Sequence, residues 1–197
     1  MSGKKRYPVR IPRFAPGIRS QDPRGGASRS WWSKRWLAAL EAMGVGGRLA
    51  RGRSYAVSGQ IVSLRIAGPR VEARVVGARS APYNVSIDFS LPGEAARDAV
   101  LSALRADPML VARLFAGDLP MEVEEILRKE GIRLFPGGKV APGVYDVTLS
   151  CSCPDWANPC KHTCAVMLIL GEEIARRPMT LLEFRGIGEG DLCDEEG

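Results

Sequence analysis

Residues 151–162 read Cys-Ser-Cys-Pro-Asp-Trp-Ala-Asn-Pro-Cys-Lys-His, and this stretch decides the fold because it holds two pairs of metal-binding side chains. Six residues separate the Cys-x-Cys pair from the Cys-x-His pair. Zinc takes four ligands in a tetrahedron, and thiolates and an imidazole satisfy it. Alternate side chains of a strand share a face, so Cys151 and Cys153 converge if the chain turns tightly after them. A closed set of Cys151, Cys153, Cys160 and His162 leaves no open position, which favours one structural Zn²⁺ ion.

Three other uses of these residues fit less well. A disulfide framework leaves His162 without a role and suits secreted proteins rather than cytosolic ones. An iron–sulfur cluster usually takes four cysteines and would need Cys164, but the spacing matches no ferredoxin pattern. A Cys–His hydrolase needs an oriented base, and His162 lies only two residues from Cys160. Zinc is therefore the favoured interpretation.

Two further cysteines lie outside this set. Cys164 opens the apolar run 164–170 and is interpreted as a small buried hydrophobe, with a substitute or fifth ligand as the alternative. Cys193 lies in an acidic tail and is interpreted as a free surface thiol.

The hydrophobic pattern predicts an antiparallel meander with one buried face, because three segments alternate apolar and polar residues. These segments are 60–67, 70–76 and 82–89. A further short strand is predicted over Tyr55–Ser58. A second hairpin is predicted from 132–135, through a turn at 136–138, to 144–149, where the chain enters the cysteines.

Helical periodicity marks the rest of the chain. Ser30 is a good N-cap for a helix whose apolar stripe includes Trp32 and Trp36, and Gly44 is placed to end it. Trp31 lies off that stripe and is the tryptophan we expect to contact a partner. The other helical segments are 96–104, 109–115, 121–131 and 162–174.

These patterns predict a mixed α+β fold, arranged along the chain in five segments. They are a basic extended or disordered arm (1–29), a Trp-rich helix with a small antiparallel sheet (30–91), a helical segment (92–135), a zinc module of a β-hairpin plus a helix (136–188), and an acidic tail (189–197).

Positive charge is concentrated at the start of the chain. Residues 1–55 hold thirteen Lys and Arg against two acids, whereas residues 56–197 hold fifteen against twenty. Such a basic segment favours an anionic partner, most often nucleic acid, although it also fits a solvated segment that only aids solubility. The candidate phosphate contacts are Lys4, Lys5, Arg6, Arg10, Arg13, Arg48, Arg51, Arg53 and Lys161. Arg65, Arg70, Arg74 and Arg79 either extend this basic surface or are ordinary solvent-facing residues.

Several classes of protein are excluded by what the sequence lacks. Its longest apolar run is seven residues, against the roughly 20 that span a bilayer. No apolar region follows Lys4 and Lys5, so we expect no secretory signal. No phosphate-binding loop, nucleophile elbow or pair of catalytic carboxylates is recognisable, so we expect no enzyme and no small-molecule substrate. We expect a cytoplasmic or nucleoid-associated protein with no membrane partner.

The Cys-x-Cys and Cys-x-His pairs, with Pro-Asp-Trp after the first pair and an aliphatic helix after the second, resemble the SWIM zinc finger. The segments MTLLEFRGIG (179–188) and GRLARGRSYAVSGQIVSL (47–64) and the Trp-rich helix resemble prokaryotic SWIM proteins more weakly. The resemblance covers most of residues 30–188. It implies that Cys151, Cys153, Cys160 and His162 bind the zinc.

The resemblance also implies a role in binding DNA or protein partners, often beside helicase-like ATPases of the Swi/Snf type or transposases. Together with the basic segment, it supports a non-enzymatic nucleic-acid-binding protein, with DNA favoured over RNA. The alternative is an adaptor that docks a helicase-like ATPase, or a recombination or ribosomal complex, through protein contacts.

Overall fold

The structure is a computed structural model that describes residues 13–22, 30–137, 139–141 and 144–193. Its described residues combine helices with an antiparallel sheet, which confirms the expected α+β class. The predicted arm falls partly outside them, at residues 1–12 and 23–29, together with Lys4, Lys5, Arg6 and Arg10.

The main sheet of the described residues has four antiparallel strands in the order β1-β2-β3-β6. They are β1 (Ile61–Ala67), β2 (Arg70–Val75), β3 (Tyr83–Phe89) and β6 (Val147–Cys151). The first three strands form the meander expected from the alternating pattern. The fourth is the strand of the cysteine module, and it pairs with β3 so that Cys151 lies opposite Val85. The module is therefore continuous with the sheet.

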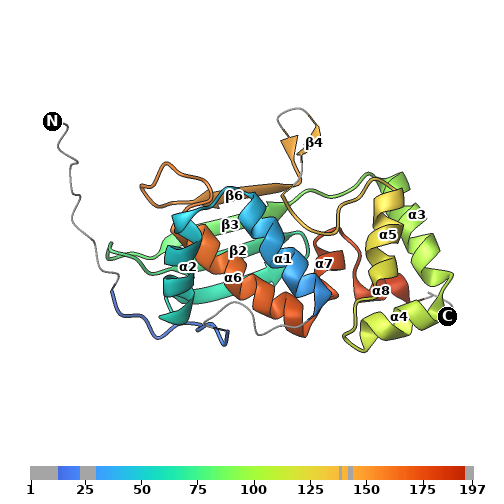
Figure 1. The fold of residues 1–197 in the computed structure, drawn as a ribbon, viewed down its shortest axis with the longest axis horizontal. Coiled ribbons are helices and arrows are strands. Elements are labelled where there is room, and N and C mark those ends of the chain that lie inside the picture. The colour runs from blue at the N-terminus through green and yellow to red at the C-terminus, as the bar shows by residue number, and fades with distance from the viewer. Residues whose placement is uncertain (1–12, 23–29, 138, 142–143, 194–197) are drawn as a thin grey trace.

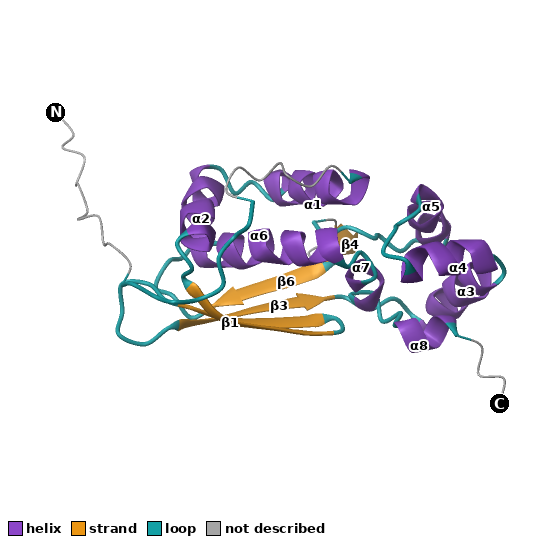
Figure 2. Ribbon diagram, turned by 90° about the horizontal axis from the view of Figure 1, so that it is seen from below, coloured by secondary structure: helices purple, strands orange, loops and turns teal. Residues whose placement is uncertain are grey.

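Helices cover one face of this sheet in two layers. Figure 2 shows α6 (Lys161–Arg176) lying on the sheet, with α1 (Trp31–Ala42) above it. α6 is buried along most of its length, which follows from its continuous apolar sequence. Trp36 of α1 donates its indole N–H to the carbonyl of Met167 at 3.0 Å and fixes the two helices together. Among the described residues, no helix combines the length and the apolar character that crossing a membrane would require.

A second helix, α2 (Gly47–Val57), crosses α6 at close range. The strand predicted over Tyr55–Ser58 was therefore wrong. The buried residues of α2 are Gly52, Tyr55 and Ala56, whose spacing of three and four is helical. A methyl group on Gly52 would lie 2.6 Å from the Cys164 Cβ atom, so the absence of a side chain permits the close crossing.

The predicted second hairpin was also wrong in its first strand. Residues 132–135 form no strand, and Phe135 instead packs edge-on against Trp31 with ring centroids 5.8 Å apart. A smaller hairpin forms from β4 (Lys139–Ala141) and β5 (Val144–Tyr145). In this loop Ile132, Leu134 and Phe135 are buried and Arg133 is exposed, and a short sequence pattern of this kind does not separate a packed loop from a strand.

Residues 13–22 are packed on the body, although they were expected to belong to an extended or disordered arm. Ala15 is buried, and Ile18 forms an antiparallel bridge with Ile61 at the edge of the sheet. The Ser20 hydroxyl donates to the Glu172 carboxylate at 2.6 Å. These backbone and side-chain bonds tie the segment to both β1 and α6.

A helical unit is inserted between β3 and β6 and lies at the end of the molecule opposite α2 (Figure 1). It consists of α3 (Glu94–Arg105), α4 (Pro108–Phe115) and α5 (Met121–Lys129). Trp31 donates its indole N–H to the carbonyl of Leu119 at 2.8 Å and so joins this unit to α1. The tryptophan that we expected to contact a partner therefore has an internal anchoring role.

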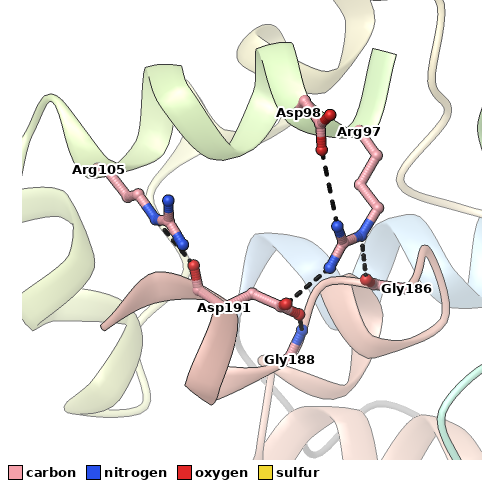
Figure 3. A network of polar contacts seen from close by, with 6 residues as sticks. All are labelled: Arg97, Asp98, Arg105, Gly186, Gly188 and Asp191. Atoms are coloured by element: carbon pink, nitrogen blue, oxygen red, sulfur yellow. Dashed lines mark hydrogen bonds and ion pairs between the residues drawn. The ribbon is translucent and has the colours of Figure 1, made fainter. Parts of the chain in front are cut away.

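The chain end holds the helical unit in place. After α7 (Thr180–Glu183), the short helix α8 (Glu189–Leu192) lies against α3. Figure 3 shows the contact: Arg97 binds the Asp191 carboxylate at 2.6 Å and the Gly186 carbonyl at 2.8 Å. These bonds couple α3 to the segment that follows α6.

We expect Gly52→Ala to destabilise the fold, because the new methyl group would meet the backbone and side chain of α6. Overpacking of this kind costs about 1–3 kcal/mol, although alanine alone favours a helix by about 1 kcal/mol. Gly47→Ala is the matched control, since its methyl group would meet nothing within 4 Å. Urea unfolding should give a lower midpoint for Gly52→Ala only. A Gly52→Ala midpoint equal to that of the unaltered protein would refute the close crossing of α2 and α6.

Candidate metal centre

The four predicted ligands come from two elements and the loop between them. Cys151 ends β6, and Cys153 lies two residues further on. Cys160 is the N-cap of α6 and His162 lies in its first turn. Their ligand atoms all lie within 4.8 Å of one another, so the fold brings together the four residues that the sequence singled out.

The distances fit a tetrahedral zinc ion. The His162 Nδ1 atom lies 3.8 Å from the Sγ atoms of both Cys151 and Cys160. Zinc bonds of about 2.3 Å to sulfur and about 2.0–2.1 Å to nitrogen would set sulfur and nitrogen about 3.6 Å apart in a tetrahedron. Three soft thiolates and an imidazole are a donor set that suits Zn²⁺. The residues present therefore fit one zinc ion, held by all four side chains.

The loop between the ligand pairs is fastened to the sheet. The Asn158 side chain donates to the Leu149 carbonyl at 2.8 Å, and the backbone N–H of Asn84 donates to the Ser152 hydroxyl at 2.9 Å. The Asp155 carboxylate accepts from the backbone N–H of Ala157 at 3.2 Å. The loop thus has a defined conformation in which its ends hold the cysteines.

Aromatic rings fix the imidazole of His162. Tyr55 lies edge-on at 5.1 Å and Tyr83 lies at 4.6 Å, both between ring centroids. A methyl group on Gly77 would lie 3.4 Å from His162 Nε2, which has no hydrogen-bond partner among the described residues. Metal-binding histidines usually donate this N–H to an oxygen, whereas here packing orients the ring. Sequence reasoning missed these three neighbours, because they come from two segments that lie far from the cysteines along the chain, and no spacing links them to the ligands.

The thiols differ in acidity. A hydrogen bond from Cys151 is the main cause that lowers the pKa of Cys160, helped by His162 and Thr163. The contact with Cys160 and burial raise the pKa of Cys151. Cys160 also occupies the N-cap position of α6, where the helix dipole favours negative charge. One thiolate is thus stabilised by the protein, and zinc binding would release the protons that the other cysteines hold.

The two remaining cysteines lie outside the cluster. Cys164 is buried beneath Gly52, and burial raises its pKa to about 11 against the opposing charges of Arg48 and Arg51. Its thiol is therefore neutral near pH 7, which supports its interpretation as a core residue. Cys193 is exposed in the described part of the tail.

The candidate phosphate contacts that the structure describes differ in their surroundings. Arg13 and Arg51 are exposed, and Lys161 lies over the Tyr55 ring at 5.9 Å, beside the metal centre. Arg48 lies on the same helix as Arg51 and donates to the carbonyls of residues 44 and 45. Arg53 instead lines a cavity of about 550 Å³ between α1, α2 and α6. Arg48 and Arg51 thus lie near the finger, although they are about a hundred residues away from it in the sequence.

We expect Cys160→Ser to lose the metal, because a serine hydroxyl replaces a thiolate ligand. Bound zinc should fall from about one per chain toward zero, and the melting temperature should fall because metal binding and folding are coupled. Cys193→Ser is the matched control and should keep both values. Cys164→Ala should also keep its zinc. Full zinc occupancy and stability in Cys160→Ser would mean that the ligand assignment is wrong.

Comparisons with known proteins place this cluster in a family. The family model described as the SWIM zinc finger matches residues 144–171. The uncharacterized protein Rv2102 of Mycobacterium tuberculosis (strain ATCC 25618 / H37Rv) is 38% identical over 176 residues. This similarity covers 89% of the present chain but 62% of the relative, so the chain spans less than two thirds of that protein. No solved structure matches significantly. The matched segment contains the whole Cys₃His cluster, and residues 144–171 are therefore a SWIM zinc finger with a site for one structural zinc ion.

Proposed function

We propose that this protein is a non-enzymatic nucleic-acid-binding protein, with DNA favoured over RNA, in which the zinc finger gives rigidity to the binding surface. The observation that carries the proposal is the charge distribution: thirteen Lys and Arg against two acids in residues 1–55. Neutralising phosphates with such cations releases counterions and drives binding to any nucleic acid.

The packing of α2 supports this proposal further. Arg48 and Arg51 lie on the helix that crosses α6, and their charges act on Cys164, one turn after the ligand Cys160. Lys161 immediately follows that ligand. Cations from two distant parts of the sequence therefore lie beside the finger, where one polyanion can meet both.

The open face of the sheet is a weaker candidate for phosphate contact. Arg70 is paired there with Glu72 at 3.1 Å and with Asp88 at 3.5 Å. A phosphate would have to compete with these carboxylates for the guanidinium. This argues that the binding surface lies at the finger end rather than across the sheet.

The donor set supports a non-enzymatic role. Four protein ligands close the tetrahedron, whereas a catalytic zinc keeps a position for water or substrate. The zinc then contributes folding energy and holds the loop, and the surrounding side chains make the contacts. Such a protein would act in the cytoplasm or on the nucleoid.

A second candidate function is an adaptor that binds a protein partner. It is favoured by three large apolar side chains exposed on the helical unit, namely Met109 at 71%, Met121 at 65% and Phe115 at 47%. Exposed apolar groups of this kind are common at protein interfaces. Purification from native cells with and without nuclease separates the two roles, since a protein partner stays bound after nuclease treatment.

We expect binding to weaken steeply with salt, and the double variant Arg13→Gln, Arg51→Gln to have a shallower dependence. Each lost phosphate contact reduces the slope of log affinity against log salt by about 0.7–0.9, so the pair should remove roughly 1.4–1.8. Fluorescence polarisation with a labelled oligonucleotide measures this. Lys129→Gln, which removes one cation from the distant helix α5, is the control and should leave the slope unchanged. A flat slope for the unaltered protein would refute the proposed function.

A further inference from the structure

The finger loop presents a tryptophan to solvent. Trp156 is 94% exposed, the largest exposed fraction among the large apolar side chains of the described residues. The other three tryptophans are buried or half-buried. An exposed indole leaves a large apolar ring in water, and tryptophan is enriched at interfaces, so Trp156 is a candidate contact residue whose surroundings must supply the further evidence.

The loop that carries this indole has a defined conformation. On either side of Trp156, Asp155 accepts from the Ala157 N–H, and Asn158 donates to the Leu149 carbonyl. A ligand that meets the ring would therefore lose little affinity to ordering of the loop, as preorganised surfaces do.

Cations surround the finger from three separate segments. Lys161 lies over Tyr55 and Arg79 lies over Tyr83, each 5.9 Å from the ring centroid, and both rings pack on His162. Arg13, the first described residue, donates its backbone N–H to the carbonyl of Gly77. Gly77 lies beside the ligand, since a methyl group on it would be 3.4 Å from His162 Nε2. Figure 1 shows the finger loop, the β2–β3 loop, α2 and the start of the described chain at one end of the sheet.

A second exposed aromatic residue lies at this end. Phe14 is 82% exposed and directly follows Arg13. The other large apolar side chains exposed beyond 45% among the described residues are Leu91, Met109, Phe115 and Met121, in or beside the helical unit. The finger end therefore combines exposed aromatic rings with cations, which is the composition that binds unpaired bases through stacking and phosphates through charge.

We propose that Trp156 and Phe14 stack on unpaired bases of a single-stranded nucleic acid whose phosphates meet Arg13, Arg79 and Lys161. This inference rests on the proposed function and adds the form of the nucleic acid. The bases of a duplex are stacked on one another along its length, so a projecting indole finds free base faces only in a single strand. The finger then contributes a contact as well as rigidity.

The test uses the full chain and compares Trp156→Ala with Trp156→Phe. Polarisation is measured with labelled 20-nucleotide oligothymidylate, oligouridylate and a duplex of equal length. We expect Trp156→Ala to weaken single-strand binding about 5- to 150-fold and to leave the salt slope unchanged, because stacking releases no counterions. Trp156→Phe should retain most of the affinity, and duplex binding should change less than about twofold. Phe14→Ala should act in the same direction.

Controls separate this inference from the proposed function. Met109→Ala, at another exposed apolar residue, should leave binding unchanged, and zinc content should stay the same in every variant. Unchanged single-strand affinity in Trp156→Ala, beside a steep salt slope in the unaltered protein, would overturn the stacking contact alone. Equal losses for single strand and duplex would overturn it too. No binding of any oligonucleotide by the unaltered protein would instead overturn the proposed function.

Discussion

The structure depends on the burial of α6 from its first turn. Cys160 caps this helix and His162 is already buried, while Val166, Ile169 and Leu170 further along it form the centre of the core. Because α6 begins at the metal centre and also fills the core, the geometry of the metal centre and the packing of the core depend on each other. Any shift of the ligands would move the helix on which the sheet, α1 and α2 all pack. Because the zinc ion would join the end of β6 to the start of α6, metal affinity contributes directly to the stability of the fold.

The sequence predicted those elements whose signal is periodic or chemical. The meander, the Trp-rich helix and the cysteine cluster follow from alternation, helical spacing and ligand spacing. The helix α2 was missed because a run of Gly and Arg has a weak apolar stripe, and because the tertiary contact at Gly52 compensates for the low helix propensity of glycine. Residues 132–135 were misassigned because a short run of mostly apolar residues also occurs in a buried loop. The packing of residues 13–22 depends on backbone hydrogen bonds to Gly59 and Ile61, which a pattern of side chains in the sequence does not predict.

The surroundings of the metal centre could not be predicted at all. The rings of Tyr55 and Tyr83 reach His162 only because α2 crosses α6 and because β3 lies beside β6. Both arrangements are long-range, and one sequence carries no information on such pairings. The position of the cations relative to the finger could not be predicted either. The charge distribution suggested an anionic partner, but in the sequence the basic segment lies almost a hundred residues before the cysteines. Folding brings Arg51 and Lys161 to the same end of the sheet, so the finger lies among cations.

The helical unit gives the molecule a second end, which is joined to the sheet by a buried ion pair and a ring stack. Where the chain leaves β3 and enters β6, the buried Arg185 pairs with Asp146 at 3.5 Å and donates to the Ser90 carbonyl at 3.3 Å. Phe184 stacks on Phe89 with centroids 4.0 Å apart at the same junction. A buried ion pair gains little net stability because both charges lose water, but leaving either charge unpaired would be costly, so the pair disfavours other arrangements. These contacts hold the finger end and the helical end in one orientation. The contacts that we propose with nucleic acid at one end and with a protein at the other would use different surfaces. The two proposed roles are therefore compatible within one chain.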